Sequence, residues 1–190
     1  MHADSWALKA KKLGLRSRAV FKLEEILTKT KILKRNSLVL DIGSAPGGWS
    51  ELIKTMTPSS NVYAIDLLPM DPIQDVMFFQ EDIINIDAIE EIFLLKSKFN
   101  LVISDLAPNL TGIRAVDEEN ISELNIITLD TALGYLSKSN GSFIIKTFQN
   151  SLLKKLRTEM EKSFHLVQTY KPAASKSKSA EIYLYGERPL

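Results

Sequence analysis

The 190-residue sequence predicts an α/β protein with a mainly parallel sheet and helices on both of its faces. Three observations lead to this fold class. Short apolar runs alternate along the chain with amphipathic segments of helical period. A glycine-rich turn, residues 43–48, joins one apolar run to the helical segment that follows it. The last two apolar runs are joined by a segment too short for a crossover helix, so these strands are expected to pair antiparallel at one edge.

The elements follow from the same patterns in chain order. The apolar runs predict strands at 38–42, 61–65, 76–79, 101–104, 142–147, 166–170 and 182–185. The periodic segments predict helices at 6–16, 17–28, 50–56, 87–96, 121–136 and 151–162. Ser17 is expected to cap the second helix, and 106–119 is expected to be a loop. Because there is no internal repeat or domain boundary, residues 1–190 are expected to form a single domain.

The composition excludes several kinds of site. There is no cysteine, which excludes disulfides, thiolate metal sites and a cysteine nucleophile. The two histidines, His2 and His165, lie far apart, so we expect no metal centre. No apolar run is long enough for a membrane span, and the first residues do not have the pattern of a secretory signal. We therefore expect a cytoplasmic, monomeric protein without membrane attachment.

A basic segment near the start of the chain is hidden within a net charge of +1. Between positions 9 and 35, two acidic residues, Glu24 and Glu25, stand among ten basic ones: Lys9, Lys11, Lys12, Arg16, Arg18, Lys22, Lys29, Lys31, Lys34 and Arg35. The segment with Lys171, Lys176 and Lys178 is basic again. Basic ends that fold onto one face would suit a polyanion, although a solvated lysine-rich surface has the same composition.

The turn from Asp41 to Ser50, DIGSAPGGWS, is a candidate ligand site. Its glycines allow the backbone to approach a ligand closely, and the next helix begins with free N–H groups. Pro46 removes one of these donors, so the turn suits a ligand without phosphate, such as the methionine end of S-adenosylmethionine. Asp66 and Asp82, after the second and third strands, could accept hydrogen bonds from an adenosine. Each aspartate alone is equally typical of a helix cap or a turn.

Six stretches make the chain resemble the FtsJ/RrmJ family of ribosomal RNA 2′-O-ribose methyltransferases, from about Trp6 to Gly186. They occur in family order: GLRSRAVFKL at 14–23, DIGSAPGGWS at 41–50, DLLPMDPI at 66–73, SDLAPN at 104–109, FIIKTFQ at 143–149 and SAEIY at 179–183. Residues 66–73 resemble the bacterial and organellar members in particular. The resemblance implies a Rossmann-like, S-adenosylmethionine-dependent methyltransferase fold. Its sheet has seven strands, mostly parallel, with an antiparallel last strand.

The resemblance also implies the site residues. Its catalytic set falls on Lys22, Asp105, Lys146 and Glu181. Its cofactor set falls on Asp41, Gly43, Ala45, Pro46, Gly47, Gly48, Trp49, Asp66, Leu67, Asp82, Ile83 and Asp105. The implied cofactor is S-adenosylmethionine, which leaves as S-adenosylhomocysteine, and no metal is required.

The four catalytic positions suit the chemistry of this family. A ribose hydroxyl is a weak nucleophile at neutral pH, so it must lose its proton as it attacks. Lys146 is the expected acceptor, because partial burial and the nearby charge of Lys22 favour its neutral amine. Lys22 would then stabilise the developing alkoxide. Asp105 and Glu181 would orient the lysines, but they favour the charged forms. The alternative is that both lysines stay charged and the site works by positioning.

The substrate implied by the resemblance is a uridine ribose in the A-loop of 23S ribosomal RNA, within the assembled 50S subunit. The basic segments would bind this RNA near the pocket. Two departures from the family weaken that surface: a short arm before the first helix, and Ala180, where bacterial members often carry arginine. The alternatives are the same reaction on transfer RNA or on a messenger RNA cap, and a non-catalytic ribosome-assembly factor. The Ala-Pro-Gly-Gly turn argues against a nucleotide-dependent dehydrogenase.

Overall fold

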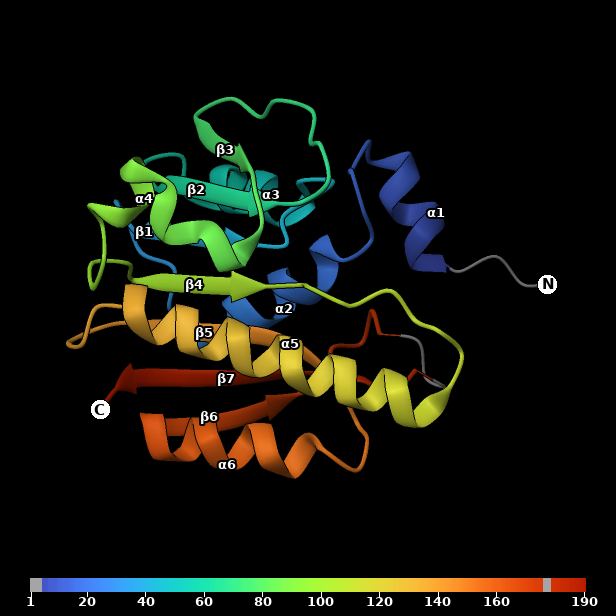
Figure 1. The fold of residues 1–190 in the computed structure, drawn as a ribbon. Helices are drawn as coiled ribbons and strands as arrows, with labels where there is room; N and C mark the ends of the chain where they lie inside the picture. The colour runs from blue at the N-terminus through green and yellow to red at the C-terminus, as the bar shows by residue number, and fades with distance from the viewer. Residues whose placement is uncertain (1–4, 176–178) are drawn as a thin grey trace.

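The computed structural model describes residues 5–175 and 179–190, and a seven-stranded sheet forms its centre (Figure 1). The strands lie in the order β3-β2-β1-β4-β5-β7-β6. Their bounds are β1 (Leu38–Ile42), β2 (Asn61–Asp66), β3 (Val76–Gln80), β4 (Leu101–Ser104), β5 (Ser142–Phe148), β6 (Phe164–Tyr170) and β7 (Glu181–Pro189). Strand β7 runs antiparallel to both of its neighbours, β5 and β6, whereas the pairings among β1 to β5 are parallel. The predicted fold class is therefore confirmed.

Helices cover both faces of the sheet (Figure 1). Helices α2 (Val20–Thr30) and α3 (Gly48–Met56) pack on one face. The other face carries α5 (Arg114–Tyr135), α6 (Leu153–Ser163), the 3-10 helix η1 (Ile83–Ala88) and the short α4 (Glu90–Phe93). The basic helix α1 (Ser5–Lys12) lies beyond the carboxyl ends of the parallel strands. Among the described residues, no helix has the length and apolarity needed to cross a membrane.

The core has two layers because the central strands bury both of their faces. Leu40 and Ile42 of β1 pack into the cluster under α5 and α6, whereas Val39 packs into the cluster under α2 and α3. All four residues of β4, Leu101–Ser104, are buried. Continuous apolar runs of this kind are typical of parallel strands covered on both sides. The two layers fix the carboxyl ends of β1 and β4, where the predicted site residues stand.

Two predictions about helix starts were wrong. Helix α2 begins at Val20, and Ala19 occupies its cap position without a side-chain hydrogen bond. The Ser17 hydroxyl instead accepts a hydrogen bond from the Ala19 N–H at 3.2 Å, which closes a turn before the helix. Helix α5 begins at Arg114, inside the predicted loop. The Asp117 carboxylate accepts hydrogen bonds from both the N–H and the hydroxyl of Thr111, so a side chain of the first turn stabilises that start.

The segment predicted as a helix at 87–96 is also different. It contains the end of η1 and the four-residue helix α4. Asp82 caps η1, since its Oδ1 accepts a hydrogen bond from the Ile84 N–H at 3.0 Å. The helical structure therefore starts at Ile83, earlier than predicted, and no regular helix spans 87–96.

Candidate active site

Four charged side chains meet at the carboxyl edge of the sheet. Lys22 comes from α2, Asp105 follows β4, Lys146 lies in β5, and Glu181 begins β7. The Lys22 Nζ lies 2.6 Å from Glu181 Oε1 and 2.8 Å from Glu181 Oε2. The Lys146 Nζ lies 3.0 Å from Asp105 Oδ1 and also donates a hydrogen bond to the Asp105 backbone carbonyl. The structure thus assembles two adjacent lysine–carboxylate pairs from the four predicted positions.

The strand register explains how these side chains face one another. Lys146 of β5 stands directly opposite Tyr183 of β7, and Glu181 lies two residues before Tyr183. Opposed residues, and residues two apart on one strand, point to the same face of a sheet. Lys22 is 4% exposed and Lys146 is 9% exposed. Buried ammonium groups need partners, which the two carboxylates supply.

Burial and charge act in opposite directions on the two carboxylates. Burial raises the pKa of Asp105 above its usual value, although the charges of Lys146 and Lys22 oppose that shift. Burial also acts to raise the pKa of Glu181, but the hydrogen bond and charge of Lys22 leave that pKa below its usual value. Glu181 is therefore a stable counter-ion, whereas Asp105 holds a proton more readily than an ordinary aspartate.

Tyr183 belongs to this cluster and was not among the predicted residues. Its hydroxyl donates a hydrogen bond to Asp105 Oδ1 at 3.4 Å, and its ring lies 6.0 Å from the Lys22 Nζ. Burial, with the charges of Asp105 and Glu181, raises the pKa of Tyr183, so the phenol keeps its proton. The sequence could have indicated Tyr183 in one way: it stands two residues after Glu181, so in a strand its side chain lies on the same face.

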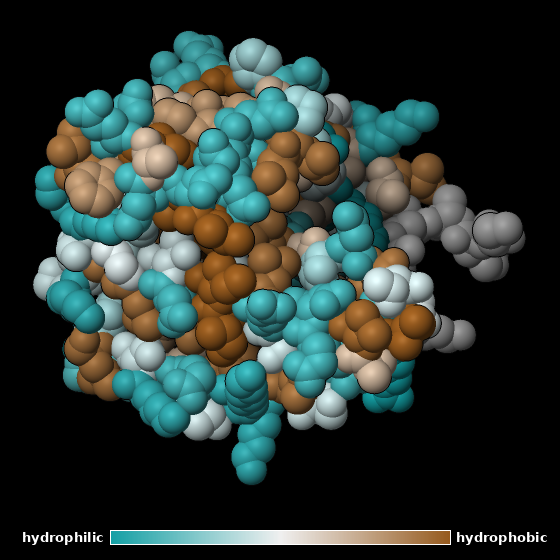
Figure 2. Space-filling model, viewed as in Figure 1, coloured by the Kyte–Doolittle hydropathy of each residue, from teal (hydrophilic) through white to brown (hydrophobic). Residues whose placement is uncertain are grey.

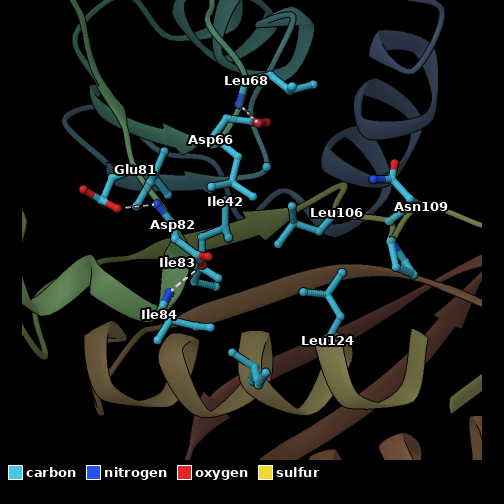
Figure 3. A pocket seen from close by; sticks show the side chains of 16 residues that line it. Ile42, Asp66, Leu68, Glu81, Asp82, Ile83, Ile84, Leu106, Asn109 and Leu124 are labelled. Atoms are coloured by element: carbon cyan, nitrogen blue, oxygen red, sulfur yellow. Dashed lines mark hydrogen bonds between the residues drawn. The ribbon is translucent and has the colours of Figure 1, made fainter. Parts of the chain in front are cut away.

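Beside the cluster lies a mostly apolar cavity of about 390 Å³, which Figure 3 shows from close by. Asp66, the last residue of β2, and Asp82, two residues after β3, stand on one side of it. The predicted residues Gly43, Leu67 and Ile83 also line it. Figure 2 shows apolar side chains along the hollow between the η1–α4 segment and α5. A cavity of this size, with a few polar groups, is typical of a small-molecule site.

The opposite wall of the cavity was not predicted. It is formed by Leu106 and Asn109 from the loop after β4 and by Leu124 from α5 (Figure 3). Leu106 covers Gly43, where an added Cβ would lie 2.4 Å from Leu106 Cδ2. Gly43 has a φ of 77°, so both its backbone conformation and this close approach favour glycine.

The two aspartates of the cavity already hold backbone groups. Asp66 Oδ2 accepts a hydrogen bond from the Ala45 N–H at 2.8 Å, and its Oδ1 accepts one from the Leu68 N–H at 2.8 Å. Asp82 has the helix-cap role that its position alone would indicate. A carboxylate can accept about four hydrogen bonds, so each retains capacity for a ligand.

A smaller recess lies at the glycine-rich turn, shares Gly43 with the cavity and reaches Asp105 of the catalytic cluster. It is lined by residues of the glycine-rich turn and by Asp105: Asp41, Gly43, Ser44, Ala45, Pro46, Gly48, Trp49 and Asp105, with Ser17 and Ala19. Asp41 is fully buried, and Ser50 donates a hydrogen bond to its Oδ2 at 2.6 Å. Within residues 5–175 and 179–190, its Oδ1 and the Ser44 hydroxyl have no hydrogen-bond partner. Burial, with the charges of Asp105 and Asp66, raises the pKa of Asp41 to about 7.

Two predicted cofactor residues have mainly structural contacts. The Trp49 indole N–H donates a hydrogen bond to the Ala19 carbonyl at 2.9 Å, and its ring packs 5.9 Å from that of Tyr183. Trp49 thereby holds the start of α2, the helix of Lys22. Gly47 lies outside both the cavity and the recess, under the side chains of Met70 and Ile73. Within the described chain, no group of three or more His, Asp or Glu side chains is arranged to hold a metal ion.

The predicted basic surface near the pocket is partly used inside the fold. Arg16 donates hydrogen bonds to the backbone carbonyls of Pro46, Asp71 and Pro72, and so ties the glycine-rich turn to the loop after β2. Lys171 donates to the carbonyls of Ser179 and Glu181, which closes the loop before β7. The predicted contacts through Lys176 and Lys178 lie outside the described residues.

Comparison with known proteins agrees with this arrangement. The chain is 40% identical over 184 residues to the ribosomal RNA large subunit methyltransferase E of Buchnera aphidicola, covering 95% of this chain and 88% of that protein. It is 41% identical over 187 residues to the Ehrlichia chaffeensis protein of the same name, covering 96% and 87%. The crystal structure of a Plasmodium falciparum protein assigned as a ribosomal RNA methyltransferase is similar, with a TM-score of 0.82 and 34% identity, covering 92% and 98%. Residues 15–188 match the model of FtsJ-like methyltransferases, so the chain belongs to that family.

Proposed function

We propose that this protein transfers a methyl group from S-adenosylmethionine to a ribose 2′-hydroxyl of large-subunit ribosomal RNA. The observation that carries the proposal is the position of Asp105. It borders the recess, which shares Gly43 with the cavity, and its Oδ1 lies 3.0 Å from the Nζ of Lys146. A group that can take a proton therefore stands beside the place where a methyl donor would lie.

The chain's own residues fit such a cofactor. The apolar walls of the cavity suit an adenine ring, and the carboxylates of Asp66 and Asp82 would accept hydrogen bonds from ribose hydroxyls and from the adenine amino group. In the recess, Asp41 Oδ1 is a buried acceptor without a partner among the described residues, and it suits the positively charged methionine end. When bound, S-adenosylmethionine supplies an electrophilic methyl group.

The catalytic cluster would remove the proton of the attacking hydroxyl. Lys146 accepts that proton when its amine is neutral, and its own proton can pass to Asp105, whose carboxylate is a better acceptor than usual because its pKa is raised. Lys22, paired with Glu181, would stabilise the developing negative charge on the ribose oxygen. Tyr183 keeps its proton and orients Asp105.

The substrate assignment rests on the relatives. The Buchnera and Ehrlichia proteins are named for methylation of large-subunit ribosomal RNA, and they are similar along nearly the full chain. A 2′-hydroxyl is present in RNA and absent from DNA, which agrees with the proposed chemistry. We further propose a uridine of the A-loop within the assembled 50S subunit as the target. In this proposal the whole chain acts as one monomeric methyltransferase domain in the cytoplasm.

The test is transfer of labelled methyl from S-adenosylmethionine to large ribosomal subunits that lack the modification. Free large-subunit RNA and transfer RNA run beside them, and Lys146→Ala is the matched control. Label on a single A-loop uridine ribose, lost with Lys146→Ala, is the expected result. Label confined to transfer RNA, or to a messenger RNA cap in a parallel assay, would move the reaction to that substrate. Cofactor binding without transfer to any RNA would favour a non-catalytic assembly factor.

A further inference from the structure

The basic N-terminal segment divides between two opposite edges of the molecule. Helix α2 carries Lys22 at the active-site edge and ends at Thr30, with Lys31 directly after it. At 1.5 Å per residue, the helix separates Lys22 from Lys31 by about 14 Å along its axis. Lys34 and Arg35 follow before β1 begins at Leu38. The last part of this basic segment therefore stands at the amino ends of the parallel strands, away from the catalytic cluster.

A second cavity, of about 610 Å³, opens at that opposite edge. Its cations come from two distant parts of the chain: Lys31, Lys34 and Arg35 before β1, and Arg188 near the end of β7. In Figure 1, the carboxyl end of β7 and the loop that leads into β5 lie at the same edge of the sheet. One acidic residue, Glu187, is among the lining residues, so the cavity has a clear excess of positive charge.

These four cations have no partner among the described residues. All four are exposed, and no hydrogen bond or ion pair of their side chains is present in residues 5–175 and 179–190. Some other exposed cations of the chain are paired, such as Lys29 with Glu25 and Arg157 with Glu161, each within one helix. Like charges gathered without counter-ions repel one another and attract an anion.

The backbone at this cavity is unusual in the same places. Lys31 has a φ of 55°, Asn36 a φ of 59° and Arg188 a φ of 54°. This left-handed conformation favours glycine, and Lys31 occupies the position after a helix where glycine is most common. The chain instead places a cation at two of these three positions.

We propose that this cavity binds the phosphodiester backbone of an RNA segment other than the one that presents the target ribose. The inference rests on the proposed function, because it concerns the same RNA substrate. The cations surround a space much larger than one phosphate group, and Asn140 adds an amide donor to its wall. An RNA strand bound at this edge cannot reach the active site at the opposite edge within a few nucleotides. A folded ribosomal RNA, however, can reach both edges.

The test uses a pair of variants with the same change in net charge. Lys34→Gln with Arg35→Gln removes two cations of the cavity. Lys154→Gln with Lys155→Gln removes two adjacent, exposed cations of α6 that also have no side-chain partner in the described chain. Arg188→Gly removes a cation from the other wall, and glycine accepts its positive φ. Binding of deproteinised large-subunit RNA and of a short single-stranded RNA that contains the target is measured at several salt concentrations.

The cavity variants should raise the Kd for the large RNA several-fold. They should also make the association constant less dependent on salt, so that the plot of its logarithm against log salt is less steep by about one per lost contact. Methyl transfer should show a higher KM for the large RNA with the same kcat, and both the affinity for the short RNA and that for S-adenosylmethionine should stay unchanged. Provided that the unaltered protein methylates the RNA, two outcomes would overturn the inference. One is that the α6 control variant weakens RNA binding as much as the cavity variants do. The other is that the cavity variants leave the salt dependence of binding unchanged. Absence of transfer by the unaltered protein would instead count against the proposed function.

Discussion

The Nζ of Lys22 lies 2.6 Å from Glu181 Oε1, an ion pair that joins α2 to the first residue of β7 across 159 positions of sequence. The Ser175 hydroxyl also donates a hydrogen bond to Glu181 Oε1 at 3.0 Å. The pair therefore fixes the helix, the loop before β7 and the strand at one point. Its position inside the catalytic cluster makes it both a structural and a functional contact.

Breaking this pair from one side should destabilise the fold. Glu181→Ala leaves the nearly buried Lys22 without a counter-ion, and we expect a loss of about 2–3 kcal/mol in the free energy of unfolding. This is below the roughly 3–5 kcal/mol of a fully buried pair, because Glu181 retains some contact with solvent. Urea denaturation measures the change. The double variant Lys22→Met with Glu181→Met should lose less than either single change, whereas additive losses would show that the two side chains are not coupled.

The role of Lys146 as a base can be separated from a role in positioning. Lys146→Arg keeps a positive charge beside Asp105, but a guanidinium does not release its proton in this pH range. If Lys146 accepts the hydroxyl proton, kcat for methyl transfer should fall by a factor of about 10² to 10⁴ while cofactor affinity stays the same. Single-turnover transfer and calorimetric binding of S-adenosylhomocysteine measure the two quantities. Retention of most of the activity by the arginine variant would support a purely positioning role.

The raised pKa of Asp41 should make stability depend on pH. Its folded-state pKa of about 7 is above the model-peptide value of 3.8, so the folded protein binds this proton more tightly than the unfolded chain. The contribution of Asp41 to stability therefore falls as pH rises from about 4 to 7, and is constant above that range. Asp41→Asn should stabilise the protein more at pH 8 than at pH 5, as measured by urea midpoints. It should also weaken cofactor binding at pH 8, and an equal gain at both pH values would refute the assignment of this titration to Asp41.

The sheet could be predicted closely because its strands are apolar runs with clear ends. Leu101–Ser104, buried on both faces, has the same bounds in the prediction and in the structure. The start of α5 could not be predicted from periodicity, since it depends on the Asp117 carboxylate reaching back to Thr111. Element types depend on local pattern, whereas boundaries depend on individual side chains whose partners are set by the fold.

The site was harder to predict for a related reason. The four catalytic positions were assigned through a family resemblance, because a lysine in an amphipathic helix or at a strand end is common. The charge pattern also could not indicate that Arg16 and Lys171 bind backbone carbonyls, or that Lys34 lies at the opposite edge from Lys22. Carbonyl acceptors are present at every residue, so the sequence does not indicate which ones a cation will meet.

The contact between Gly43 and Leu106 predicts how the glycine-rich turn limits cofactor access. In Gly43→Ala, the new Cβ would lie 2.4 Å from Leu106 Cδ2 and 3.2 Å from the Leu106 Cα, at a φ of 77° that alanine rarely adopts. Overpacking costs about 1–3 kcal/mol and the left-handed conformation about 1–2 kcal/mol more. We expect Leu106 to be pushed into the cavity, with a rise of at least about tenfold in the Kd for S-adenosylhomocysteine, because 1.4 kcal/mol is a factor of ten.

A second substitution tests whether the effect of Gly43→Ala comes from this contact. Leu106→Ala removes the side-chain atoms that the new Cβ would meet, but it leaves the strained backbone conformation in place. The double variant should therefore bind the cofactor almost as tightly as Leu106→Ala alone does. Its free energy of unfolding should still be reduced by the strained backbone conformation. Calorimetric titration and urea denaturation measure the two quantities separately. If Leu106→Ala restores no affinity, the loss arises from the turn itself, and the close approach of Leu106 does not control access to the cavity.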